Sequence, residues 1–140
     1  MAEEVSNRRI ILKDFVTGSL NESDMELKSI NISLKLPDSC SHGVLVKNLY
    51  LSIDPYARGR MGKPTASGYL QTCKPGLPVT GYAVARVVDS RDPRFKKGDL
   101  VWGWLGWEEY SLVTFTEGLF RIEHTDVPLS YYAGILALFL

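Results

Sequence analysis

The stretch GVLVKNLYLSIDPYARGRM (residues 43–61) decides the fold, because it joins a β-strand to a short helix through a turn. Side chains over Gly43–Ser52 alternate between two faces, as they do in a strand. One face receives Val44, Val46, Asn48 and Tyr50, and the other receives Leu45, Lys47, Leu49 and Leu51. Asp54 followed by Pro55 is typical of a helix N-cap with proline at the first helical position. We therefore expect a strand, a turn and a short helix that runs through Met61.

Further runs with strand character lie on either side of this stretch. Gly, Pro, Asp and Ser residues separate them, and they cover Arg9–Phe15, Leu27–Leu36, Pro78–Ser90, Leu100–Trp104, Glu109–Phe115 and Leu119–Ile122. Residues 62–76 are rich in Gly, Pro, Ser and Thr, which is typical of a loop. Gly81 interrupts one run and indicates either a β-bulge or the close approach of another group. Short strands at regular spacing predict a mainly β fold with short helices, either a barrel or a sandwich.

The last segment of the chain changes to helical spacing. Asp126 is placed to cap a helix, whose apolar positions are Leu129, Tyr132, Ile135, Leu136 and Phe139. Residues 137–140 make the end of this helix apolar on most sides, and such a helix requires burial all round. We therefore expect this segment to pack against another chain or against a partner domain.

Composition excludes several classes of function. The 140 residues suit one domain, and the 16 Lys and Arg residues balance the 16 Asp and Glu residues. A neutral chain without basic runs has little attraction for nucleic acid or an anionic membrane. No apolar stretch reaches the roughly 20 residues of a membrane span, and no signal peptide is evident at the first residues. We expect a cytoplasmic protein in which Cys40 and Cys73 stay reduced.

Four long segments carry a resemblance to a known family. KNLYLSIDPYARGRM (residues 47–61) closely resembles the corresponding segment of plant NADP-dependent alkenal reductases, which belong to the leukotriene B4 dehydrogenase and prostaglandin reductase group of medium-chain dehydrogenases. Three further segments resemble the same family and follow in the same order, namely PGLPVTGYAVARVVDS (75–90), KKGDLVWGWLGWEEYS (96–111) and HTDVPLSYYAGIL (124–136). Several long segments in order are far more specific than one short motif.

The resemblance implies a GroES-like, partly open β-barrel over residues 1–126, the substrate-side domain of such enzymes. Residues 127–140 would then begin the helix that leads to a Rossmann domain carrying NADPH. No GxGxxG or AxxGxxG turn and no βαβ unit occurs in the sequence. We therefore expect the Rossmann domain to be absent from this chain, and NADPH binding by the chain alone to be weak or nil.

The resemblance also concerns metal. In zinc-dependent relatives, a Cys follows the strand equivalent to 44–50, and a Gly-His-Glu stands where this chain has Gly81-Tyr82-Ala83. Catalytic zinc needs converging thiolate, imidazole or carboxylate ligands. This chain has Ser52, Ile53 and Tyr82 in that region, and His42 and His124 lie far apart in sequence. We expect no zinc, and we interpret both histidines as loop residues.

The resemblance places the substrate cleft and the nicotinamide end of NADPH at the turn after residue 52. It implies that Tyr56 and Tyr82 bind the substrate and that Pro55 and Tyr56 contact the cofactor. Packing roles remain open for both tyrosines, and no residue of this chain is assigned as catalytic. For Asp54 we favour the role of a helix cap.

The other polar and aromatic residues of this region are assigned structural roles. We expect Arg58 and Arg60 on a solvated helix face, with contact to cofactor phosphate as the alternative. We interpret Trp102, Trp104 and Trp107 mainly as core and barrel-rim packing, and the alternative is that one of them forms a pocket wall.

Two functions of different classes follow. The first is the N-terminal domain of an NADPH-dependent oxidoreductase that reduces the α,β-double bond of enals and enones, inactive on its own. The second is a non-catalytic interaction module that docks on itself or on full-length relatives through residues 129–140.

Overall fold

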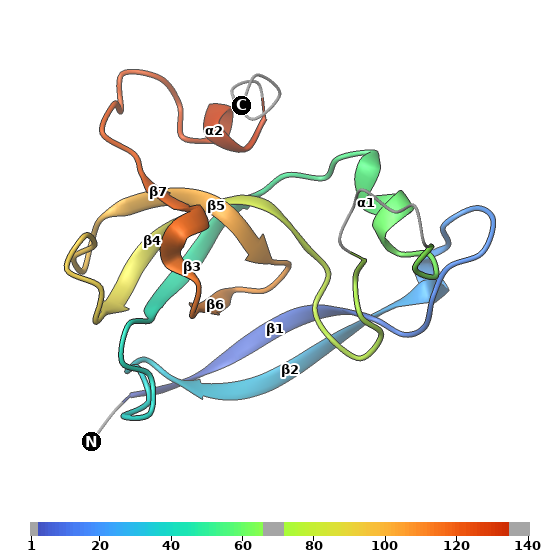
Figure 1. The fold of residues 1–140 in the computed structure, drawn as a ribbon, viewed down its shortest axis with the longest axis horizontal. Coiled ribbons are helices and arrows are strands. Elements are labelled where there is room, and N and C mark those ends of the chain that lie inside the picture. Colours follow the sequence, from blue (N-terminus) through green and yellow to red (C-terminus); the bar gives the residue numbers. More distant parts are fainter. Residues whose placement is uncertain (1–2, 66–71, 135–140) are drawn as a thin grey trace.

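The computed structural model describes residues 3–65 and 72–134, and it contains two antiparallel sheets. β1 (Glu4–Leu12) and β2 (Met25–Ser33) form a two-stranded hairpin. The five-stranded sheet has the order β6-β3-β4-β5-β7, with β3 at Val44–Leu51, β4 at Thr80–Ser90, β5 at Leu100–Gly106, β6 at Tyr110–Val113 and β7 at Leu119–Arg121. Figure 1 shows the hairpin running beneath the five-stranded sheet.

The hairpin is joined to the larger sheet by single bridges. Arg9 pairs with Glu108, and Ile11 pairs with Pro78. Within the described residues β6 and β7 remain the two edges of the five-stranded sheet, so the barrel is partly open. This confirms the predicted fold class, since all the predicted strand runs correspond to strands.

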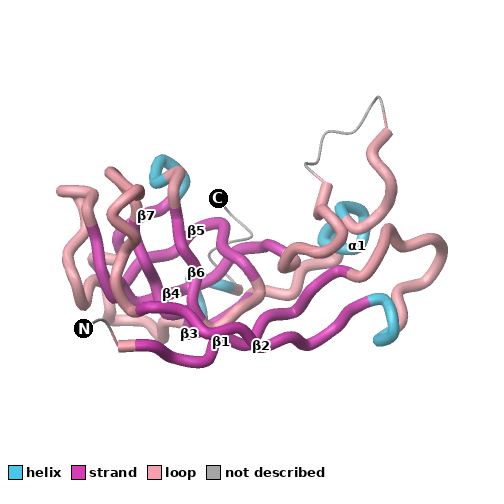
Figure 2. The backbone as a smooth tube through the Cα atoms, turned by 90° about the horizontal axis from the view of Figure 1, so that it is seen from below, coloured by secondary structure: helices cyan, strands magenta, loops and turns pink. Residues whose placement is uncertain are grey.

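Two short helices lie at different ends of the molecule. α1 (Tyr56–Arg60) follows β3, and α2 (Ser130–Ala133) follows β7. Figure 1 and Figure 2 both place α1 near the far end of the hairpin, away from the N-terminus. Single 3-10 turns occupy Glu22–Asp24 and Thr116–Gly118. Within the described residues no helix is long and apolar enough to cross a membrane.

The core consists of apolar side chains contributed by several strands. The main cluster fills the inside of the five-stranded sheet with Val44, Val46, Ala83, Ala85, Val87, Phe95, Val101, Leu105 and Leu119. A second cluster lies between the hairpin and α1 and consists of Leu12, Val16, Ala57, Met61, Cys73, Val79 and Trp107. Period-two alternation along β5 explains why only every second residue of that strand enters the core.

Two details differ from the sequence expectations. The first strand begins at Glu4 rather than Arg9, because residues 4–8 pair with residues 29–33 of β2. The buried Asn7 side chain also exchanges two hydrogen bonds with the backbone of Tyr110. The last helix begins at Ser130, so Asp126 does not cap it. Residues 135–140, including the expected apolar end of that helix, lie outside the described residues.

Gly81 marks a close approach rather than a bulge. Its position in the pairing of β4 with β5 is regular, opposite Leu105. A Cβ atom at Gly81 would lie 3.2 Å from Nε1 of Trp107 and 3.5 Å from the carbonyl oxygen of Ser52. The glycine therefore lets the chain after β3 and the Trp107 side chain pack against β4.

Candidate functional site

Three aromatic rings converge on the outer face of the five-stranded sheet, next to α1. The antiparallel register places Tyr82 of β4 opposite Trp104 of β5. Their ring centroids are 5.0 Å apart with an interplanar angle of 86°, which is an edge-to-face contact. Tyr56, at the start of α1, stacks on Trp104 with a centroid distance of 6.1 Å and an angle of 19°. We call Tyr56, Tyr82 and Trp104 the aromatic cluster.

The Tyr56 hydroxyl is the unusual polar group of this cluster. The hydroxyl oxygen is buried, and in the described part of the chain no acceptor meets it at full hydrogen-bonding geometry, although the Asp54 carboxylate is close enough to act on it. Burial raises the pKa of Tyr56 to about 12, and the Asp54 carboxylate adds to this rise. At neutral pH the hydroxyl therefore keeps its proton and acts as a hydrogen-bond donor. A buried donor without an acceptor is costly, and such groups often mark a ligand or water position.

Arg60 supports the cluster from α1. Its side chain is buried, with the residue only 3% exposed. Nη1 donates to the carbonyl oxygen of Thr80 at 2.7 Å, and Nη2 donates to the Thr80 hydroxyl at 2.8 Å. The guanidinium carbon lies 4.3 Å from the centroid of the Trp104 ring, within the range of a cation–π contact. The expectation that Arg60 lies on a solvated helix face was wrong, because these contacts draw the side chain inward.

The turn before α1 has a different hydrogen-bond pattern from the one predicted. Pro55 holds the N-cap position, and no side-chain cap is present. The carboxylate of Asp54 instead accepts a hydrogen bond from the Ser52 hydroxyl at 2.9 Å. The carbonyl oxygen of Asp54 accepts from the amide of Ala57 at 2.9 Å, which starts the helical turn. The predicted capping role for the Asp54 side chain was therefore wrong, and Pro55 is exposed beside Tyr56.

The structure brings together the two tyrosines that the sequence singled out, although 26 residues separate them. Sequence reasoning missed Trp104 and Arg60 as members of the same cluster. Trp104 is 37% exposed, so it is not a core residue, whereas Trp107 is 8% exposed and belongs to the core. The alternation of β5 puts Trp104 outside, but only the register with β4 shows that it contacts Tyr82.

A groove of about 410 Å³ adjoins the cluster at the end of β5 that pairs with β4 but extends beyond its pairing with β7. Trp104 and Thr80 lie on its side nearest the cluster, and Leu77 and Phe115 are among its exposed apolar walls. Its volume lies within the range of about 300–1,000 Å³ that is usual for small-molecule sites.

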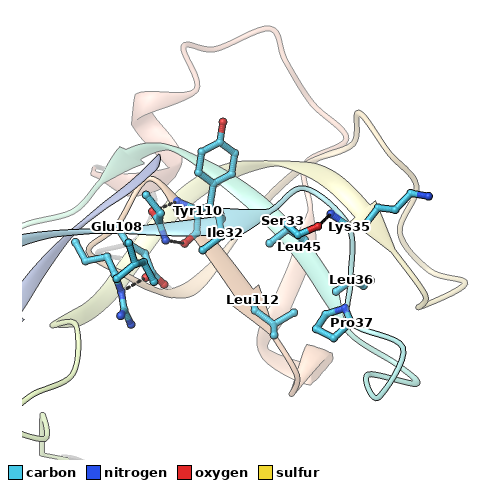
Figure 3. A pocket seen from close by; sticks show the side chains of 12 residues that line it. Ile32, Ser33, Lys35, Leu36, Pro37, Leu45, Glu108, Tyr110 and Leu112 are labelled. Atoms are coloured by element: carbon cyan, nitrogen blue, oxygen red, sulfur yellow. Dashed lines mark hydrogen bonds and ion pairs between the residues drawn. The ribbon is translucent and has the colours of Figure 1, made fainter. Parts of the chain in front are cut away.

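A separate cavity, also of about 410 Å³, lies between the hairpin and the edge of the larger sheet (Figure 3). Its walls include Ile32, Leu45 and Leu112, and the ion pair between Arg9 and Glu108 lies at one end. None of the three residues of the aromatic cluster lines this cavity. It is therefore distinct from the predicted substrate region.

The potential metal ligands do not converge. In residues 3–65 and 72–134, no group of three or more His, Cys, Asp or Glu side chains is arranged to hold a metal ion. His42 and His124 are exposed loop residues, as expected. Cys40 and Cys73 are both free thiols, and Cys73 is buried in the second core cluster.

The helix α2 packs on the same sheet as the aromatic cluster. Ala133 is 5% exposed and forms a small core cluster with Val84 and Ile122. The Tyr132 hydroxyl donates a hydrogen bond to the carbonyl oxygen of His124 at 2.7 Å. Of the predicted docking segment 129–140, the structure describes residues 129–134. This described part packs against its own chain.

Comparisons with known proteins agree with the fold. Residues 8–122 match a family model described as the N-terminal domain of oxidoreductase. The chain is 59% identical over 138 residues to an NADP(+)-dependent 2-alkenal reductase of Nicotiana tabacum, covering 99% of this chain and 40% of the relative. It is 44% identical over 135 residues to (+)-pulegone reductase of Mentha piperita, covering 96% of this chain and 39% of the relative.

Solved structures give the same result. The crystal structure of CurA from Vibrio vulnificus superposes with a TM-score of 0.76 at 29% identity, covering 93% of this chain and 36% of CurA. The structure of CurA in complex with NADPH gives a TM-score of 0.74 at 28% identity, covering 92% of this chain and 36% of that chain. The chain thus spans about 40% of the length of the two plant relatives.

Proposed function

Because this chain belongs to the family described as the N-terminal domain of oxidoreductase, which its residues 8–122 match, we propose that it forms the substrate-side domain of an NADPH-dependent reductase. The substrates would be enals and enones, whose α,β-double bond is reduced. Relatives named as 2-alkenal, pulegone and curcumin reductases support this substrate class. The free thiols of Cys40 and Cys73 support the cytoplasm as its setting.

The buried Tyr56 hydroxyl is the observation that carries the proposal. Reduction of a conjugated double bond moves negative charge onto the carbonyl oxygen, and a correctly placed donor stabilises that charge. The Tyr56 hydroxyl has no acceptor at full hydrogen-bonding geometry in the described residues, and burial beside the Asp54 carboxylate keeps it protonated well above neutral pH. We propose that Tyr56 donates to the substrate carbonyl, and that Tyr82 borders the same site through its contact with Trp104.

The cofactor would contribute the hydride when it is bound. Pro55 is exposed next to Tyr56, so both residues are available to contact the nicotinamide end. The chain offers no comparable site for the diphosphate of NADPH, since α1 has only 5 residues and the sequence contains no GxGxxG turn. We therefore propose that this chain alone binds NADPH weakly or not at all and turns over no substrate.

Calorimetric titration of the chain with 4-phenyl-3-buten-2-one, compared with trans-β-methylstyrene, tests the role of Tyr56. The second probe lacks the carbonyl but keeps the aryl-substituted double bond. Tyr56→Phe should weaken binding of the ketone by about tenfold, the effect of one hydrogen bond of roughly 1–1.5 kcal/mol. Binding of the hydrocarbon should not change.

Tyr131→Phe is the matched control, because Tyr131 is an exposed tyrosine of α2 outside the cluster. Equal affinities of wild type and Tyr56→Phe for the ketone would remove Tyr56 from the site. A wild-type chain that binds neither probe would contradict the proposed function itself. NADPH binding in the micromolar range would show that the chain holds a cofactor site of its own.

The second proposal is a non-catalytic one, in which the chain docks on itself or on full-length relatives through residues 129–140. The packing of Ala133 and Tyr132 against their own chain gives it no support over residues 129–134. Sedimentation analysis at rising protein concentration tests it, and a constant monomer mass would reject self-association.

A further inference from the structure

We propose that Trp104 determines specificity at this site, by providing a flat wall that favours enones with an aryl substituent on the β-carbon over those with a short alkyl substituent. The inference rests on the proposed function and extends it to a third residue, Trp104, beside Tyr56 and Tyr82. It names the part of the substrate that the chain recognises, which is the group at the far end of the double bond from the carbonyl.

Trp104 is the member of the aromatic cluster that is open to a ligand. The residue is 37% exposed, and its ring contacts both tyrosines at centroid distances of 5.0 Å and 6.1 Å. It also borders the groove that continues past Thr80 to Leu77 and Phe115. Trp104 therefore contacts both tyrosines of the proposed site and also lines the groove. A substrate whose carbonyl reaches Tyr56 would extend its other end along this indole.

The indole is held in place on several sides. Tyr82 meets it edge to face, Tyr56 stacks on it, and the Arg60 guanidinium lies 4.3 Å from its centroid. Arg60 is in turn held by two hydrogen bonds to Thr80. Arg60 is thus a positioning residue that acts through Trp104. An immobilised ring loses little conformational entropy when a ligand packs on it, which favours binding.

The ring chemistry sets the preference. A tryptophan face attracts another flat ring in offset-stacked or edge-to-face geometry beyond the gain from buried area, whereas an alkyl chain gains only the area. The exposed groove residues Leu77 and Phe115 extend the apolar surface, and the charged residues of the lining, Arg9 and Glu108, form an ion pair with each other. A planar aryl enone therefore suits this wall better than a short aliphatic one.

The test compares two ketones that share the carbonyl and the double bond. Calorimetry of the 140-residue chain measures the dissociation constants of 4-phenyl-3-buten-2-one and 3-penten-2-one, with intact mass recorded to exclude covalent addition to Cys40. Trp104→Leu should weaken binding of the aryl ketone by about tenfold and change that of the alkyl ketone by less than about twofold. Trp104→Phe, which keeps a flat ring, should retain most of the preference.

Arg60→Lys tests the positioning role in a double-mutant cycle. It should reduce the aryl preference by about threefold in the wild-type background, and it should have no effect on that preference when Trp104 is already leucine. An effect of equal size in both backgrounds would show that Arg60 does not act through the indole.

The outcomes distinguish a failure of the Trp104 role from a failure of the proposed function. If Trp104→Leu leaves the ratio of the two dissociation constants unchanged, whether or not both become weaker, Trp104 does not determine specificity. If Trp104→Phe behaves like Trp104→Leu, the flat ring is not the cause. If wild type binds neither ketone, the proposed function fails, and the role of Trp104 fails with it.

Discussion

Tyr82 and Trp104 lie directly opposite each other on β4 and β5, with their ring centroids 5.0 Å apart and their planes at 86°. An edge-to-face pair of this kind stabilises a structure by about 0.5–1.5 kcal/mol beyond the burial of area. Because Tyr56 stacks on the same indole, the pair also links α1 to the sheet. The tyrosine of β4 and the tyrosine of α1 are therefore positioned by one shared tryptophan.

Ionisation of the Tyr56 hydroxyl should lower the stability of the chain at alkaline pH. Burial, with the Asp54 carboxylate nearby, raises the pKa of Tyr56 from 10.0 to about 12 in the folded state. Its contribution to the free energy of unfolding is therefore fully present below about pH 10 and is lost as the pH rises toward about 12. Urea unfolding at about pH 9 and about pH 11 should show a larger loss for wild type than for Tyr56→Phe. Identical losses would mean that the hydroxyl is not buried in solution.

The carboxylate of Asp92 stabilises the segment between β4 and β5 at neutral pH, and this stabilisation is lost in acid. Hydrogen bonds from the Arg94 guanidinium hold the pKa of Asp92 well below its usual range, and the Thr116 hydroxyl also donates to it at 2.7 Å. Asp92→Asn should lower the free energy of unfolding at neutral pH by about 1.5–3 kcal/mol, as expected for hydrogen bonds to a charged group. Because the folded pKa is depressed, the difference between wild type and variant should shrink as the pH falls below about 4.

Denaturant titrations at several acid pH values measure this difference. Asp38→Asn is a suitable control, because the Asp38 side chain is fully exposed although it also pairs with an arginine. A difference between wild type and Asp92→Asn that stays constant down to about pH 2 would contradict the assigned pKa direction.

Two glycines should respond to alanine in opposite ways. A Cβ atom at Gly103 would lie 2.5 Å from the carbonyl oxygen of Gly118 and 3.3 Å from Cα of Leu119, so the backbone of the following turn must move. Gly103→Ala should destabilise the chain by about 1–3 kcal/mol, as overpacking usually does. Gly59, inside α1, has no atom within 4 Å of such a Cβ. Gly59→Ala should be neutral or stabilising by up to about 1 kcal/mol, since alanine favours helix.

Thermal unfolding of the two variants distinguishes these effects. Equal melting temperatures for Gly103→Ala and wild type would show that the contact between β5 and the turn at Thr116–Gly118 is looser than the structure indicates.

Arg91 holds the loop that follows β2. Its guanidinium donates to the carbonyl oxygens of Pro37 at 2.9 Å and of Cys40 at 2.8 Å. Arg91→Met should free this loop, and trypsin should then cleave after Lys35 several times faster, because proteolysis follows local opening. Arg121→Met, which removes only an exposed pair with Glu123, is the matched control and should leave this rate unchanged. Unchanged cleavage after Lys35 in Arg91→Met would show that the loop is held by other contacts.

The strands could be predicted because their signal is local. Side-chain alternation along Val44–Leu51 follows from the two-residue period of a strand, and the pattern can be recognised without knowing its neighbours. Errors occurred where a distant group decides the structure. Asn7 belongs to β1 because it pairs with Ile30 of β2, and its side chain also bonds to the backbone of Tyr110, which lies 103 residues away. The error at Asp54 has a local cause instead, because its carboxylate accepts a hydrogen bond from Ser52, two residues earlier, and does not cap α1.

The sequence by itself determined the mainly β class, the order of the strands along the chain and the turn at Asp54-Pro55, all of which depend on short segments. The family resemblance singled out Tyr56 and Tyr82 as site residues. Only the tertiary structure decided that Trp104 joins these tyrosines and that Arg60 turns inward to hold it. The physical reason is the register between β4 and β5, together with the packing of α1 against them. Register depends on pairing between distant segments, whereas alternation within a single strand shows only which side chains share a face.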